Sequence, residues 1–270
     1  PGVVTLGLVA SGLVGAVAWS LFTWWRGLPT SSSHALLGGL AGAAIAKGGI
    51  GALDLAFFGK TALFIVVAPV LGCVLGYASM KIILDNLIHD GRLAKIIVAF
   101  SYPGERLTEY PDDPDHAEWL TCELLPELEK RFPLLAAPAA RCLMGTSFGA
   151  VAALSTAVRF PRNYGSLLLQ SGSFLYSDPA VWHGEGSDFN PVVRFIDHYR
   201  AHPVRPADRA FLSCGAYEDL VEANRGMLPI FRDTGMKINY VESPDGHSWE
   251  AWRDHLGPGL CWLFPGDLST

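Results

Sequence analysis

Charged positions are spread unevenly along the chain, and the change near residue 80 divides it into two unlike parts. Residues 1–80 hold four charges, while the following 190 residues hold 42; the four are Arg26, Lys47, Asp54 and Lys60. Residues 3–25 and 61–80 contain no charge and are each long enough to cross a bilayer as a helix. The pattern predicts an all-α transmembrane segment over residues 1–80 and a separate domain over residues 81–270.

A third hydrophobic stretch, residues 27–46, lies between these two. It is broken at Gly27-Leu-Pro29 and then carries a polar run of Thr30, Ser31, Ser32, Ser33 and His34. The simplest interpretation is a third hydrophobic helix with a polar turn at its entrance. Gly38 and Gly42 are small residues at four-residue spacing, which predicts close approach of a neighbouring helix.

Beyond residue 80, short apolar runs alternate with amphipathic segments. Helical spacing predicts helices over residues 81–89, 116–131, 148–160, 190–202, 220–232 and 249–264. Apolar runs predict strands over residues 95–100, immediately before Ser147, and over 166–169, 210–213 and 237–241, with a long loop containing Trp182 and Gly184. Such an alternation indicates a parallel sheet covered on both faces, with a site in the loops at the carboxyl ends of the strands.

The sequence Gly145-Thr-Ser147-Phe-Gly149 follows one of these apolar runs and opens an alanine-rich helical pattern. A serine on such a strand-to-helix turn is pushed out above the sheet edge, and flanking glycines accommodate the backbone. The start of the helix aims the Phe148 N–H at an oxyanion forming beside Ser147. An ordinary turn is the alternative, because glycine is abundant in the chain, with 29 residues.

Two further loops carry candidate residues in the same order as a hydrolase triad. Glu218 and Asp219 follow one predicted strand, and His247 follows the last. Nucleophile, acid and histidine is the chain order of α/β-hydrolases, in which the histidine takes the serine proton and the carboxylate orients the imidazole. Taken separately, His247 could be a surface group and Glu218 a helix N-terminal charge. Loop placement favours Glu218 over Asp219 as the acid.

Composition narrows the function classes. The second part has a net charge of −8 and so offers no basic patch for nucleic acid. The five cysteines, at 73, 122, 142, 214 and 261, are widely spaced, which predicts buried free thiols instead of a disulfide framework or metal site. We expect no metal or organic cofactor. The chain begins with Pro1 inside an apolar run, and we expect a fragment or a processed product.

The stretch from Trp24 to Gly39, which contains the polar run, closely resembles the repeat motif of the PiT family of inorganic phosphate transporters. In that family a broken helix lined with hydroxyls helps form the ion and phosphate site. The resemblance implies that Thr30, Ser31, Ser32 and Ser33 line such a site. Members of the family have two inverted repeats, each with a Gly-Ala-Asn-Asp motif, and this chain has neither the second repeat nor that motif.

Residues 82–266 resemble the enterochelin-esterase-like family, which is similar to feruloyl esterases and antigen 85 proteins. The motifs that carry the resemblance are Leu84-Asp-Asn-Leu-Ile88, Arg106-Leu-Thr-Glu109-Tyr110, Gly145-Thr-Ser147-Phe-Gly149, Gln170-Ser-Gly-Ser173, Glu222-Ala-Asn224-Arg225 and Asp245-Gly-His247-Ser-Trp249-Glu-Ala-Trp252. The resemblance implies an α/β-hydrolase fold with Ser147 as nucleophile, His247 as general base and Glu218 as acid. It also places Arg106 and Tyr110 near the substrate, although Arg106 could equally form a loop ion pair.

Family members carry several strands before the Leu84-Asp-Asn helix, and here the transporter-like segment occupies that position. We therefore expect an α/β-hydrolase-like parallel sheet that lacks its first strands, preceded by PiT-like transmembrane helices. The leading hypothesis is a membrane-attached serine esterase acting on a small-molecule ester, and the alternative is a sodium/phosphate transporter fragment with an inactive hydrolase passenger. A single crossing by residues 27–60 would put Arg26, Lys81 and Arg92 on one side and favour a cytoplasmic hydrolase domain, whereas a re-entrant hairpin would reverse it.

Overall fold

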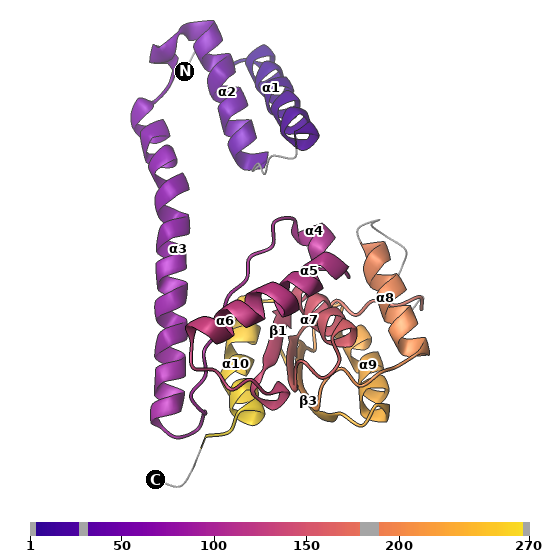
Figure 1. Ribbon diagram of the computed structural model, residues 1–270. Helices are drawn as coiled ribbons and strands as arrows, with labels where there is room; N and C mark the ends of the chain where they lie inside the picture. Colours follow the sequence, from indigo (N-terminus) through magenta and orange to yellow (C-terminus); the bar gives the residue numbers. More distant parts are fainter. Residues whose placement is uncertain (1–3, 27–31, 179–188, 267–270) are drawn as a thin grey trace. The chain divides into compact units, whose positions relative to one another are not determined.

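The computed structural model of the protein describes residues 4–26, 32–178 and 189–266, and its elements are labelled in Figure 1. These residues form two compact units, Pro1–Ser79 and Met80–Thr270. The predicted loop residues Trp182 and Gly184 lie outside the described residues. Each unit has its own internal packing.

The first unit is entirely helical within its described residues. It contains α1 (Leu6–Trp25), α2 (Ser32–Gly48), the short 3₁₀ turn η1 (Ile50–Ala52) and most of α3 (Leu55–His89). By length and composition, Leu6–Thr23 and Leu55–His89 are candidates for crossing a membrane, a test that buried core helices and signal sequences also pass. The predicted third hydrophobic helix corresponds to α2.

Helices α1 and α2 pack closely, but through glycines other than the predicted pair. A Cβ added at Gly39 would lie 2.3 Å from the Gly12 carbonyl oxygen, and one added at Gly12 would lie 2.6 Å from Leu40 Cδ2. No atom lies within 4 Å of a Cβ built at Gly38 or Gly42. The prediction for Gly38 and Gly42 was therefore wrong. Gly39 lies directly against α1, whereas a side chain at Gly38 or Gly42 would make no such close contact.

The second unit is an α/β fold, as the alternating pattern predicted. Its strands are β1 (Cys142–Thr146), β2 (Ser166–Gln170), β3 (Arg209–Gly215) and β4 (Lys237–Ser243). In the described residues they form one parallel sheet in the order β1-β2-β3-β4. The helical segments are α4 (Arg106–Glu109), α5 (Pro114–Glu118), the π-helical η2 (Trp119–Leu124), α6 (Leu125–Arg131), η3 (Pro138–Ala140), α7 (Phe148–Arg159), α8 (Asn190–Ala201), α9 (Val221–Asp233) and α10 (Trp249–Leu263).

Helices cover both faces of this sheet. Successive strand residues point to opposite sides, so the apolar strands place side chains on both faces that pack against helices. Leu167, Leu169 and Leu212 pack on one side into a core shared with α7, α8 and α9. Leu168 and Phe211 point to the other side and pack against α10. The last turns of α3 also pack against this second core, through Met80, Leu84, Leu87 and Ile88. Figure 1 shows α10 and α7 on opposite sides of the strands.

Two predicted elements beyond residue 80 were wrong. Residues 95–100 form no strand; Leu93 makes an isolated antiparallel bridge with Pro265, and the Ala94 N–H donates to the Phe264 carbonyl at 3.1 Å. An apolar run forms a strand only where its backbone can hydrogen-bond to a neighbouring strand. In the described residues β1 pairs with β2 alone, so residues 95–100 do not extend the sheet. Residues 81–89 are the end of the long helix α3 and not a separate short helix.

The cysteine prediction held only in part. Cys214 is buried, and burial raises the pKa of its thiol to about 12. Cys122 is exposed, which contradicts the prediction, and Cys142 and Cys261 are half-buried. Cys122 lies in the π-helical stretch, where the wider turn changes which side chains face the core. The side chain of Cys73 lies outside the described residues.

Candidate active site

The turn from β1 into α7 holds Ser147 in an unusual backbone conformation. Its φ of 55° and ψ of −122° lie in a region that side chains other than glycine rarely adopt. The Ser147 N–H continues the sheet ladder by donating to the Gln170 carbonyl oxygen at 3.0 Å. This geometry places the Ser147 hydroxyl at the carboxyl edge of the sheet and at the N-terminus of a helix of 12 residues.

Of the two motif glycines, the close approach requires Gly145 only. A Cβ at Gly145 would lie 2.0 Å from the Gly149 carbonyl oxygen, so α7 could not start so close to β1. A Cβ at Gly149 would meet Tyr110 Cε2 at an ordinary 3.8 Å.

Parallel register brings the ends of neighbouring strands to the same edge as Ser147. Thr146 pairs with Gln170, and Gln170 pairs with Ser213, so the residues that follow β1, β2 and β3 converge there. Glu218 lies in the turn after β3, and His247 lies between β4 and α10. The structure therefore gathers at one edge the three positions predicted from chain order.

Glu218 and His247 form a direct pair. His247 Nδ1 lies 2.7 Å from Glu218 Oε2, and the Glu218 side chain is 1% exposed. The other oxygen, Oε1, accepts from the Gly215 N–H at 2.7 Å and from the Ser171 hydroxyl at 2.6 Å. Burial acts to raise the pKa of Glu218, but the hydrogen bonds from His247, Ser171 and Gly215 outweigh it and hold the pKa below its ordinary value. Asp219 is exposed, so the structure places Glu218 beside the imidazole.

The Ser147 hydroxyl contacts another serine. Ser147 Oγ lies 3.2 Å from Ser173 Oγ, and the Ser173 N–H donates to the Ser147 carbonyl oxygen at 3.2 Å. Within the described part of the chain, no hydrogen bond joins Ser147 to His247. Because Nδ1 faces Glu218, Nε2 is the imidazole nitrogen left for a proton from Ser147.

Three residues of this edge received no role from the sequence. Ser171, Ser173 and Trp252 lie inside motifs that carry the esterase resemblance, but nothing local in those motifs distinguishes them from packing residues. Trp252 Nε1 donates to Ser171 Oγ at 2.9 Å, and the Trp252 and His247 rings meet edge to face with centroids 4.9 Å apart. The sequence feature that could have identified Ser171 is its position directly after β2, the strand that pairs with the one leading to Ser147.

The predicted substrate-binding residues lie beside the first residues of α7, which follow Ser147. The Arg106 guanidinium carbon is 5.7 Å from the centroid of the Phe148 ring, which also stacks on Phe189 with centroids 5.0 Å apart. Tyr110 packs against the core that includes Phe148. Burial raises the pKa of Tyr110, and the nearby Arg106 charge partly offsets that rise. Among the described residues Arg106 forms no ion pair.

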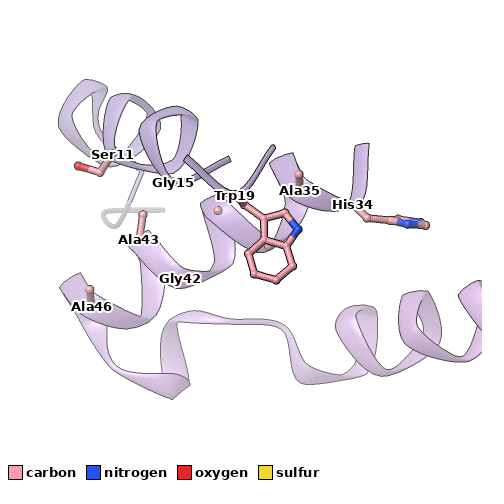
Figure 2. A pocket seen from close by; sticks show the side chains of 10 residues that line it. Ser11, Gly15, Trp19, His34, Ala35, Gly42, Ala43 and Ala46 are labelled. Atoms are coloured by element: carbon pink, nitrogen blue, oxygen red, sulfur yellow. The ribbon is translucent and has the colours of Figure 1, made fainter. Parts of the chain in front are cut away.

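The transporter-like motif is only partly described. Thr30 and Ser31 lie outside the described residues, Ser32 begins α2 and Ser33 is exposed. A pocket of about 640 Å³ lies between α1 and α2. The residues that line it are drawn in Figure 2: Ser11, Gly15, Trp19, His34, Ala35, Gly38, Gly39, Gly42, Ala43 and Ala46. Ser33 is not among its lining residues. Small apolar residues dominate the lining, and Gly38 and Gly42 face this pocket.

No group of three or more His, Cys, Asp or Glu side chains in residues 4–26, 32–178 and 189–266 is arranged to hold a metal ion. The arrangement at the sheet edge instead provides a hydroxyl, an imidazole and a carboxylate. These are the groups that nucleophilic acyl transfer needs.

Comparison with known proteins finds two kinds of relative. The phosphate transporter family model matches residues 1–158, a range that continues beyond the first unit to include β1 and Ser147. Over 86 residues the chain is 45% identical to the "Probable low-affinity inorganic phosphate transporter" of Streptomyces halstedii, covering 30% of this chain and 38% of that protein. A Bacillus subtilis (strain 168) protein of the same description is 40% identical over 88 residues, covering 33% of this chain and 26% of that protein.

The second kind of relative is an esterase. Over 173 residues the chain is 30% identical to the iron(III) enterobactin esterase of Dickeya dadantii (strain 3937), covering 57% of this chain and 36% of that protein. The crystal structure of enterochelin esterase from Shigella flexneri superposes with a TM-score of 0.56 at 24% identity, covering 66% of this chain and 44% of that chain. This likeness shows the fold.

All of these curated relatives are much longer than the parts they share with this chain, which spans between 26% and 38% of their lengths. Both suspected resemblances are confirmed by these matches. The chain thus belongs, through residues 1–158, to the phosphate transporter family, and its second unit has an esterase-like α/β fold.

Proposed function

We propose that the second unit is a serine carboxylic-ester hydrolase that works through an acyl-enzyme. The observation that carries the proposal is the Glu218–His247 pair, with Oε2 and Nδ1 2.7 Å apart, at the same sheet edge as the strained Ser147. The esterase relatives named above support the same reaction class.

In the proposed reaction, Ser147 Oγ attacks the ester carbonyl carbon while His247 Nε2 accepts the hydroxyl proton. The Phe148 N–H, at the start of α7, donates to the carbonyl oxygen as it becomes an oxyanion. Collapse breaks the bond to the leaving alcohol, which receives the proton from His247. A water molecule then repeats these steps on the acyl-enzyme, releasing the acid and restoring Ser147.

Glu218 holds the imidazole in the tautomer that carries its proton on Nδ1, and it stabilises the imidazolium that forms during each step. Arg106 and Tyr110, beside Phe148, are proposed to contact the substrate. The proposed steps use no metal and no organic cofactor.

The test is ester turnover by the full chain in detergent micelles, with p-nitrophenyl butyrate as substrate and a fluorophosphonate as active-site probe. We expect Ser147→Ala and His247→Ala to reduce turnover by about 10³-fold or more and Ser147→Ala to abolish labelling. Ser155→Ala is the matched control, because Ser155 is a buried serine of α7 whose hydroxyl donates to Asp112 instead. Equal turnover by wild type and Ser147→Ala would reject the proposal.

We also propose that residues 1–80 attach the protein to a membrane, with the hydrolase unit on the cytoplasmic side. Support comes from the transporter family match and from the apolar helices α1 and α3. The expected result is that the chain remains in the membrane pellet after an alkaline carbonate wash, with residues 81–270 open to protease only in inverted vesicles. Release by the wash would reject attachment.

A second candidate function is phosphate handling by the first unit, with the hydrolase unit as a passenger. The family match and the polar run from Thr30 to Ser33 favour it. Sodium-dependent phosphate uptake into vesicles reconstituted with the chain, lost on Ser32→Ala, would support this function. Vesicles without uptake would reject it and would leave the hydrolase proposal unaffected.

A further inference from the structure

Four side chains form a closed ring of contacts around the Glu218 carboxylate. Glu218 Oε2 pairs with His247 Nδ1 at 2.7 Å, and Glu218 Oε1 accepts from Ser171 Oγ at 2.6 Å. Ser171 Oγ accepts in turn from Trp252 Nε1 at 2.9 Å. The ring closes where the Trp252 indole meets the His247 imidazole at an interplanar angle of 90°.

The chemistry of these groups determines the direction of each hydrogen bond. An indole N–H can only donate, so Ser171 Oγ must accept from Trp252. An ionised carboxylate can only accept, so the single proton of the Ser171 hydroxyl points to Glu218. Ser171 is 1% exposed, so water does not compete for either bond.

The backbone at Ser171 supports a specific role for its hydroxyl. Its φ of 46° lies in the left-handed region that favours glycine, yet the position holds a serine. The Ser171 N–H donates to the Ser213 carbonyl oxygen at 2.7 Å, which extends the sheet ladder and aims the side chain at Glu218.

We infer that Ser171 and Trp252 are positioning residues that hold the Glu218 carboxylate and the His247 ring in register for the hydrolysis proposed above. With Oε1 occupied by Ser171 and by the Gly215 N–H, only Oε2 faces the imidazole. Trp252 fixes the Ser171 hydroxyl and, through its ring, limits tilting of His247. Neither residue touches the reacting atoms.

The experiment compares the full chain in detergent micelles with Ser171→Ala and Trp252→Phe. One readout is kcat and KM for p-nitrophenyl butyrate, and the other is the low-field proton resonance of the carboxylate-bound His247 Nδ1–H. Since a hydrogen bond to a charged group is lost, we expect Ser171→Ala to lower kcat by about 10- to 100-fold at unchanged KM. We expect the low-field resonance to disappear in Ser171→Ala and to weaken in Trp252→Phe.

Matched variants separate positioning from general damage to the fold. Ser171→Gly removes the same hydroxyl but relieves the backbone strain, so it should behave like Ser171→Ala. Ser155→Ala removes a serine that donates to the carboxylate of Asp112, outside the ring. Trp249→Phe alters an exposed indole that meets Trp252 with centroids 4.9 Å apart. Ser155→Ala and Trp249→Phe should both keep the resonance and the wild-type kcat.

The resonance makes this inference testable apart from the proposed function. If the wild-type chain shows the resonance but hydrolyses no ester, the proposed hydrolase function is rejected. The positioning of His247 is then still tested by the resonance in the same variants. Retention of the resonance in both Ser171→Ala and Ser171→Gly would overturn the inference, whatever their turnover. Its absence from wild type would overturn it as well.

Discussion

The carboxyl group of Glu218 illustrates how donors can outweigh burial at a single residue. Removal from water disfavours the charged form, but three hydrogen-bond donors converge on its two oxygens. The net result is a pKa below the ordinary value of 4.5. A buried carboxylate in this state accepts at both oxygens and remains charged at neutral pH, as a partner for an imidazolium must.

This shift makes a prediction for stability. A carboxyl group whose folded pKa is depressed stabilises the folded state above its unfolded pKa, and that contribution is lost as pH falls through the folded pKa. Glu218→Gln should therefore destabilise the second unit at pH 7 by about 1 to 3 kcal/mol. The gap from wild type should shrink as pH falls below 4.5. Urea unfolding of the full chain, followed by tryptophan fluorescence between pH 7 and pH 3, measures both effects.

Asp219→Asn is the control for this prediction, since Asp219 is the exposed neighbour of Glu218. Its unfolding curves should run parallel to those of wild type over the same pH range. A gap for Glu218→Gln that stays constant from pH 7 to pH 3 would contradict the prediction.

At the scale of elements, the junction of β1 and α7 depends on one contact between backbone atoms. The Cβ missing at Gly145 would lie 2.1 Å from the Gly149 carbonyl carbon and 2.6 Å from the Ala150 nitrogen. Because these are backbone atoms, a side chain at Gly145 would have to displace the start of α7 from the strand. Ser147 sits in this junction, so its position depends on the same approach.

We therefore expect Gly145→Ala to destabilise the second unit by about 3 kcal/mol, at or above the upper end of ordinary overpacking. Gly149→Ala, in the same motif, has room for the added methyl and lies within a helix, so its stability should stay within about 1 kcal/mol of wild type. Urea midpoints of the two variants provide the comparison. Equal destabilisation by the two substitutions would show that the close approach at Gly145 is not decisive.

The proposed membrane attachment would give helix α3 two environments. Its 35 residues extend about 52 Å, which exceeds the roughly 30 Å of a bilayer core. Only about 20 residues are needed to span it. In the last turns of α3, Met80, Leu84, Leu87 and Ile88 pack instead against the core that contains the apolar residues of α10.

At the scale of the whole molecule, the described part of the second unit has an unpaired sheet edge at β1 and exposed apolar side chains in residues 95–100. In the described residues β1 pairs only with β2, and Ile97 and Phe100 are 50% and 72% exposed. Unpaired strand edges and exposed apolar side chains both promote association with other chains.

We therefore predict that residues 82–270 expressed alone will be only marginally soluble and will unfold without a sharp cooperative transition. Size-exclusion chromatography and thermal melting by circular dichroism test this prediction. A fragment of residues 90–270, which also loses the packing of Leu84, Leu87 and Ile88, should be less stable still. A monomeric, two-state melt of residues 82–270 with full esterase activity would contradict the prediction.

The sequence by itself determined most elements of the second unit and the order of the candidate triad. Hydrophobic period is a local property, so the helix predicted over residues 190–202 and the strand over 237–241 match α8 and β4 closely. Glycine spacing around Ser147 and the loop positions of Glu218 and His247 are also local, and the parallel fold follows from the alternation.

The tertiary structure alone decided how these elements meet. Whether residues 95–100 form a strand depends on a neighbouring strand with which they can pair. Which glycine of α2 lies against α1 depends on how α2 is rotated about its axis. Neither property can be read from the local sequence pattern. The pairing of Glu218 with His247, and the contacts of Ser171 and Trp252, join residues 29 to 81 positions apart. Such contacts arise from strand register and helix placement, which bring distant chain segments to one edge of the sheet.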